Sequence, residues 1–103
     1  MQIQVNFGDV DASQALNDHT ESAVLKELEH VAVQVTRVEV HIRDDKSNRH
    51  GADDKRCLME ARIAGEQPLA VDAKGNDLYK AITDAAGKLG RAVNRKLDRH
   101  QRI

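Results

Sequence analysis

Hydrophobic and polar residues alternate in four short stretches of the chain, and this pattern predicts four strands. The first stretch runs from Ile3 to Phe7, and the others cover residues 38–43, 56–63 and 69–73. A period of two places all apolar side chains of a strand on one face. Each strand is therefore expected to bury one face against a core and to leave the other in water.

Two longer segments have apolar residues every three or four positions, which predicts two helices. The first begins after Ser13, a residue type that caps helices, and extends to about His30. The second begins after Asn76 or Asp77 and runs towards Ile103. Its apolar residues form one stripe that must face a core, namely Leu78, Ile82, Ala85, Leu89 and Val93.

The order of these elements is β-α-β-β-β-α, which predicts an α+β fold in a single domain spanning residues 1–103. The expected architecture is a four-stranded, mainly antiparallel sheet with two helices packed on one face. The polar segment 44–54 is predicted to be a loop, and residues 65–68 a turn. Two helices side by side leave a groove between their outer surfaces, and the second helix is expected to line or border it with basic residues.

Charge is segregated along the chain, although the formal net charge is only −1. Residues 1–73 contain 8 Lys and Arg against 14 Asp and Glu, whereas residues 74–103 contain 8 against 3. An asymmetry of this kind is typical of proteins that bind a polyanion. A basic helix face that serves only solubility gives the same composition, so charge alone leaves both interpretations open.

Helical spacing gathers the basic residues of the second helix on one side, away from its apolar stripe. A line of positive charge on one helix face can follow a phosphate backbone. Lys26, on the otherwise acidic or neutral first helix, is a further candidate. The predicted RNA-binding residues of the second helix are Lys80, Lys88, Arg91, Arg95 and Arg99, with Lys96 and Arg102 as supporting charges.

Several classes of function are disfavoured by composition. Aromatic residues make up 2% of the chain and Trp is absent, which argues against a platform that stacks single-stranded bases. The single Cys57 excludes an internal disulfide and is expected to be a small buried hydrophobe. The five histidines lack metal-ligand spacing, and no catalytic constellation is evident, so we expect no metal, no cofactor and no enzyme activity. No signal peptide or membrane-length apolar run is present, which makes the cytoplasm the expected compartment.

The segment Asp77-Leu78-Tyr79-Lys80-Ala81-Ile82-Thr83-Asp84 resembles the helix start of the ribosome hibernation-promoting factor family, also called the ribosome-associated inhibitor A or sigma-54 modulation protein family. Members typically carry Asp-hydrophobic-Tyr-x-Ala-Ile-Asp there, followed by Lys-Leu and further basic residues. The resemblance covers nearly the whole chain and includes the entry to the first helix at residues 10–16. It implies a fold similar to a double-stranded RNA-binding domain.

The resemblance also implies a function and a partner. The basic helix surface would bind ribosomal RNA of the small ribosomal subunit, occluding the mRNA and tRNA channel under stress or in stationary phase. The chain resembles the short form of the family, without the second domain that pairs ribosomes, and we expect a monomer with no small-molecule substrate and no membrane contact. Thr83 and the poorly basic first helix depart from the family pattern and suggest a divergent branch. A protein-interaction module of the same fold, with no ribosome binding, is the alternative.

Overall fold

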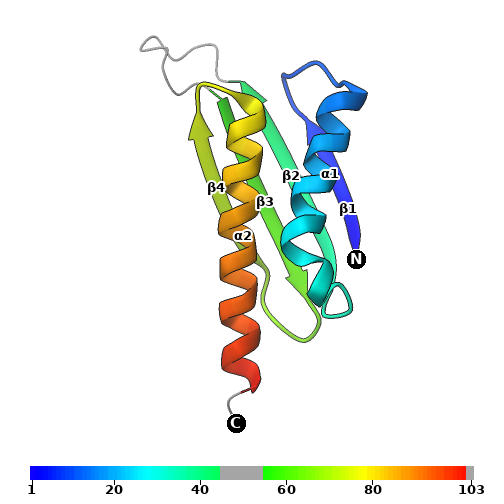
Figure 1. The fold of residues 1–103 in the computed structure, drawn as a ribbon, viewed down its shortest axis with the longest axis vertical. Helices are drawn as coiled ribbons and strands as arrows, with labels where there is room; N and C mark the ends of the chain where they lie inside the picture. The colour runs from blue at the N-terminus through cyan, green and yellow to red at the C-terminus, as the bar shows by residue number, and fades with distance from the viewer. Residues whose placement is uncertain (45–54, 102–103) are drawn as a thin grey trace.

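The predicted order of strands and helices is confirmed by the computed structural model, which describes residues 1–44 and 55–101 (Figure 1). The architecture is α+β, with a four-stranded mixed sheet and two helices. The elements are β1 (Gln2–Phe7), α1 (Gln14–Leu28), a 3-10 turn η1 (Glu29–Val31), β2 (Val35–Asp44), β3 (Lys55–Ile63), β4 (Leu69–Gly75) and α2 (Leu78–Gln101).

The sheet has the strand order β1-β2-β3-β4, and both helices lie on one of its faces (Figure 1). β1 and β2 are parallel, whereas the other two pairings are antiparallel. The parallel pair needs a crossover, and α1 supplies it. Facing residues form apolar rows across the strands; in one row Val5 pairs with Val40, Val40 with Met59 and Met59 with Val71. The helices cover these rows and close the core.

Several element boundaries differ from the sequence-based expectation. β2 begins at Val35 because this buried residue pairs with Ile63, and an irregularity of register before Arg37 interrupts the alternation that marks a strand in the sequence. β4 continues to Gly75, since pairing with β3 keeps the chain extended to that point. α1 ends at Leu28 and is followed by the short turn η1. Of the predicted loop 44–54, residue 44 belongs to β2 and the remainder lies outside the described residues.

Side-chain caps fix the first turns of both helices. Ser13 Oγ accepts a hydrogen bond of 3.1 Å from the amide of Leu16, so Ser13 is the N-cap that the sequence predicts for α1. At α2 the carboxylate of Asp77 accepts a hydrogen bond of 2.9 Å from the amide of Tyr79. The backbone carbonyl of Asp77 accepts the bond from Ala81, which makes Asp77 the capping residue of the two that the sequence offered.

α1 and α2 pack closely where α2 has a glycine. A Cβ atom placed on Gly90 would lie 3.1 Å from Glu27 Cβ and 2.9 Å from Glu27 Oε2, which is tighter than real side-chain contacts. On either side of this crossing, imidazole groups bridge the helical layer. His30 Nε2 lies 2.9 Å from Asn94 Oδ1, and His19 Nε2 lies 3.0 Å from Thr83 Oγ1. The side of α2 that faces α1 is therefore occupied by neutral residues.

We expect alanine to have opposite effects at the two glycines inside α2. A Cβ atom on Gly87 meets only the end of the Arg91 side chain, at 3.4 Å. Gly87→Ala should therefore stabilise the protein by up to about 1 kcal/mol through helix propensity. Gly90→Ala gains the same propensity but pushes against Glu27, so its free energy of unfolding should be about 1–2 kcal/mol lower than that of Gly87→Ala. Urea denaturation measures both, and equal stabilisation would mean that the helices are not in close contact at Gly90.

Candidate nucleic-acid interface

The basic residues predicted on α2 form an exposed line along the helix, which we call the cationic ridge. It comprises the described residues Lys80, Lys88, Arg91, Arg95 and Arg99, all of which are exposed. From Lys80 to Arg99 the helix rises about 29 Å at 1.5 Å per residue. Arg102, predicted as a supporting charge, lies outside the described residues.

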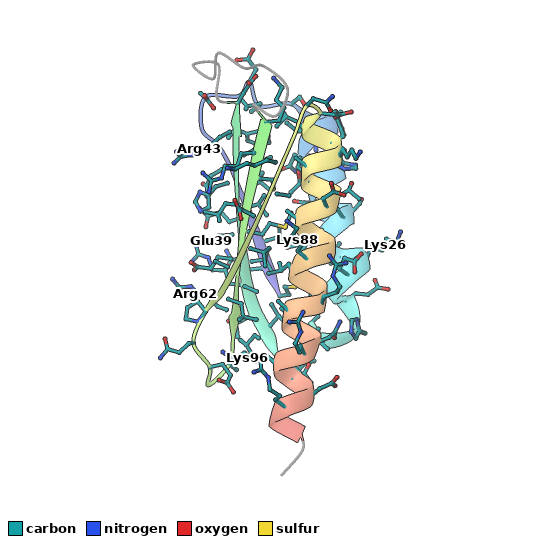
Figure 2. All side chains as sticks on the ribbon, turned by 90° about the vertical axis from the view of Figure 1, so that its left-hand side faces the viewer. Lys26, Glu39, Arg43, Arg62, Lys88 and Lys96 are labelled. Atoms are coloured by element: carbon teal, nitrogen blue, oxygen red, sulfur yellow. The ribbon has the colours of Figure 1, made fainter. Side chains whose placement is uncertain are left out.

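The ridge lies on the side of α2 towards β4 and solvent. Lys88 Nζ donates a hydrogen bond of 2.9 Å to the backbone carbonyl of Asp72 in β4. The guanidinium of Arg91 lies over Gly87, one turn earlier on the exposed helix surface. Figure 2 shows Lys88 beside the sheet, whereas Lys26 projects from α1 away from the sheet. The structure therefore brings the ridge residues together but places Lys26 apart from them.

The groove between the helices is not lined by the ridge, which differs from the expectation. A surface depression of about 210 Å³ between α1 and α2 is bordered by His19, Ser22, Ala23, Lys26 and Thr83. Lys26 is the one cation in this set. The ridge lies elsewhere because α2 turns Thr83, Gly90 and Asn94 towards α1 and its cations away from it.

Lys96, predicted as a supporting charge, belongs to a different surface. Its Nζ lies 3.8 Å from Glu66 Oε2 and 3.5 Å from the carbonyl oxygen of Gln67, in the turn between β3 and β4 (Figure 2). The side chain is only partly exposed. An ion pair with Glu66 already balances this charge, so Lys96 ties α2 to the sheet.

The positive charge of the ridge is largely unbalanced by carboxylates. Among the described residues, no ion pair within 4.0 Å involves Lys80, Arg91, Arg95 or Arg99. Lys88 donates to a neutral carbonyl rather than to an acid. Cations that have no intramolecular partner keep their full charge for an external anion. The ridge is thus an electrostatic surface that could bind phosphates.

Cys57 is a core residue, as the sequence analysis expects. Its side chain is fully buried in β3 between the sheet and the helices. This burial raises the pKa of the Cys57 thiol to about 12, because a thiolate loses its hydration there. The thiol is therefore neutral at physiological pH and is a poor nucleophile.

Tyr79 lies beside the ridge at the start of α2. Its side chain is 43% exposed, and its ring packs edge-on against the ring of His19 with 4.9 Å between centroids. Packing against α1 agrees with the position of Tyr79 at the border of the apolar stripe. Among the residues described, no group of three or more His, Cys, Asp or Glu side chains is placed to hold a metal ion. Nor does any helix in the described ranges have the length and apolarity needed to cross a membrane.

Three further cations, all on the sheet, were not predicted from the sequence as site residues. Arg43, Arg56 and Lys74 come from β2, β3 and β4 and stand opposite one another in the strand register. In the sequence Arg43 and Arg56 are polar members of alternating strands, which is an ordinary pattern for solvent-facing positions, and Lys74 follows the predicted strand 69–73. Only the register reveals that they form a row.

The mixed sheet, the two helices on one face and the exposed cationic helix define an α+β protein of β-α-β-β-β-α order. Residues 3–101 match the family described as Sigma 54 modulation protein / S30EA ribosomal protein, and the chain belongs to this family. The resemblance noted at residues 77–84 is thereby confirmed. Ribosome binding and translation regulation fit this family.

Two solved structures share the fold over nearly the whole chain. A ribosomal subunit interface protein from Coxiella burnetii has 21% sequence identity and a TM-score of 0.75, covering 95% of this chain and 99% of the other. The N-terminal domain of Protein Y from Thermus thermophilus has 18% identity and a TM-score of 0.75, covering 92% of this chain and 98% of the other. Among proteins with curated functions, none matches this sequence significantly.

Proposed function

We propose that this protein is a ribosome hibernation factor that binds ribosomal RNA of the small subunit as a single domain in the cytoplasm. Bound there, it occludes the channel that mRNA and tRNA occupy, so it silences translation by steric exclusion rather than by catalysis. The proposal rests on membership of the family and on the exposed charge of the cationic ridge, whose residues form no ion pair with the described part of the chain. The likeness to a ribosomal subunit interface protein from Coxiella burnetii supports it at the level of the fold.

The ridge supplies the affinity in this mechanism. Lys80, Arg91 and Arg95 lie on successive stretches of one helix face and neutralise phosphates that approach α2 from solvent. Contacts of this kind orient a protein on RNA and read its shape, but they do not read base sequence. The helix is held by its apolar stripe, in which Ile82 and Leu89 are fully buried, so the charges sit on a fixed support.

The proposal depends on the exposed positive charge of the ridge, and the contribution of this charge to binding can be measured. If about five phosphates are neutralised, the logarithm of the binding constant should fall with the logarithm of salt concentration with a slope of roughly −3.5 to −4.5. Co-sedimentation with isolated small subunits and whole ribosomes, at low and moderate salt, tests this expectation. A slope near zero, or no comigration at low salt, would contradict ribosome binding through the ridge.

A protein-interaction module is the second candidate, and the surface of α1 favours it. Asp18, Glu21 and Glu29 are exposed along α1 and η1, where the only neighbouring cation of these elements is Lys26. This acidic side would suit a basic protein partner, with the ridge serving solubility. Capture of one specific protein from nuclease-treated lysate, together with failure to bind purified subunits, would favour this alternative.

A further inference from the structure

The face of the sheet opposite the helices is open, and its side chains come from all four strands. Figure 2 shows Glu39, Arg43 and Arg62 on this side of the sheet, away from α1 and α2. Strand register sorts the charged residues of this face into rows that run across the sheet. The rows differ in how far their charge is balanced.

One end of the open face is balanced internally. Arg37 pairs with Arg62 in the register, and Glu39 pairs with Glu60 in the next row. Each arginine reaches the acid two positions away on its own strand. Arg37 Nη2 lies 2.8 Å from Glu39 Oε1, and Arg62 Nε lies 3.5 Å from Glu60 Oε1. This end presents two positive and two negative charges and therefore no net charge.

The other end of the open face carries excess positive charge. Arg43 pairs with Arg56, and Arg56 pairs with Lys74, so three cations stand side by side on three adjacent strands. Strands lie about 4.8 Å apart, and like charges directly opposite destabilise a sheet. Asp72 balances the charge of Arg56, because its Oδ2 lies 3.1 Å from Arg56 Nη2. Within the described ranges, Arg43 and Lys74 form no ion pair, so the row keeps an unbalanced charge.

This row and the cationic ridge meet around the outer edge of β4. Lys74 borders a surface depression of about 320 Å³ together with Lys88 and Arg91 of α2. Asp84 lines the same depression, which leaves three cations against one acid. On the open face, Arg43 and Arg56 border a second depression of about 310 Å³ with His41 and Leu58. We call the continuous surface the cationic band; it comprises Arg43, Arg56, Lys74, Lys88 and Arg91.

We propose that the cationic band holds the phosphate backbone of a single RNA strand, which passes from the ridge over the edge of β4 and onto the open face of the sheet. This inference rests on the proposed function and extends its RNA contact surface beyond α2. The band turns around the edge of one strand, and a single-stranded segment can follow that turn, whereas a duplex is far stiffer (for DNA, a persistence length of about 150 base pairs) and resists it.

Two features of the sheet suit backbone contacts of this kind. β4 is an edge strand, so its outer side has backbone amide and carbonyl groups without strand partners, and these can also bond to a sugar–phosphate chain. The residues of the open face that surround the band are His41, Leu58 and Asp72; they include no Phe, Tyr or Trp, and His41 is the one ring among them on which a base could stack. Recognition would therefore depend on charge and shape.

The test compares two double variants that remove equal charge from the same face of the sheet. Arg43→Gln/Lys74→Gln neutralises the two cations of the sheet row that form no ion pair within the described ranges, whereas Arg37→Gln/Arg62→Gln neutralises the arginines of the balanced end. Binding is measured by fluorescence anisotropy from 0.05 to about 0.3 M salt, with a labelled 20-nucleotide oligouridine and with isolated small ribosomal subunits as probes. Two lost phosphate contacts should reduce the salt slope by about 1.4 and weaken binding roughly tenfold at 0.15 M salt.

The control variant should keep the wild-type slope. Its charges lie farther from the band than the Debye length of about 8 Å at that salt, so their effect on an RNA bound there is largely screened. Circular dichroism and thermal melts verify that both variants fold. Wild-type affinity in Arg43→Gln/Lys74→Gln for both probes, or equal losses in the two variants, would overturn the band as an RNA surface. Oligouridine binding that depends on the band, without any subunit binding, would support this inference while contradicting the proposed function.

Discussion

Reversing two charges of the cationic ridge should abolish ribosome binding without unfolding the protein. In Arg91→Glu/Arg95→Glu, two phosphate contacts are lost and two repulsive carboxylates replace them. A change of four charge units at the interface should weaken binding to isolated small subunits at least 100-fold at about 0.15 M salt. Both positions are exposed and form no ion pair with any described residue, so the free energy of unfolding should change by no more than about 0.5 kcal/mol. Co-sedimentation and urea denaturation measure the two quantities.

The matched controls for this experiment are neutral substitutions. Arg91→Gln/Arg95→Gln removes two charges from the ridge and should weaken binding about tenfold, an intermediate effect. Arg37→Gln/Arg62→Gln removes two charges from the balanced end of the sheet and should leave binding unchanged. Retention of wild-type comigration by the reversed variant would show that the ridge is not the interface.

The largest effect on stability is expected from truncating the apolar side of α2. Leu89 has no exposed surface and belongs to the cluster that α2 shares with β3 and β4. Leu89→Ala removes buried methyl groups and leaves a cavity, which should lower the free energy of unfolding by about 2.5–5 kcal/mol. Domains of this size have a total stability of about 5–15 kcal/mol, so the variant should melt at least 10 °C below the wild type.

Leu25→Ala makes the same change of side chain at a position outside the core. Its side chain is 43% exposed on α1, so Leu25→Ala should cost less than about 1 kcal/mol. Thermal and urea unfolding of the two variants should therefore differ clearly. Similar losses at Leu25 and Leu89 would contradict the packing of α2 onto the sheet that fixes the ridge in place.

Local sequence patterns were sufficient for the order of elements because each pattern depends on one element alone. The alternation from Ile3 to Phe7 predicts β1 whatever strand it pairs with. The residues at which a strand begins and ends depend instead on the neighbouring strand with which it pairs. Val35 joins β2 by pairing with Ile63 across an irregular register, and Gly75 stays extended because it pairs with Lys55. No local pattern contains this tertiary information.

The same distinction separates the site residues that could be predicted from those that could not. The ridge follows from the 3.6-residue period of one helix, so Arg91 and Arg95 could be placed on one face from the sequence. The row on the sheet joins Arg43, Arg56 and Lys74, and their proximity depends on the registers of three strands. The pairing of Lys96 with Glu66 likewise depends on how α2 lies over the turn between β3 and β4.

The contact between Tyr79 and His19 has an optical consequence. Tyr79 is the only tyrosine, and the chain has no tryptophan, so nearly all of its intrinsic fluorescence arises from one side chain. That side chain lies half-exposed against the ring of His19 and next in sequence to Lys80, the first residue of the ridge. Emission from the unlabelled protein therefore reports on the junction of the two helices at the end of the surface where RNA is expected to bind.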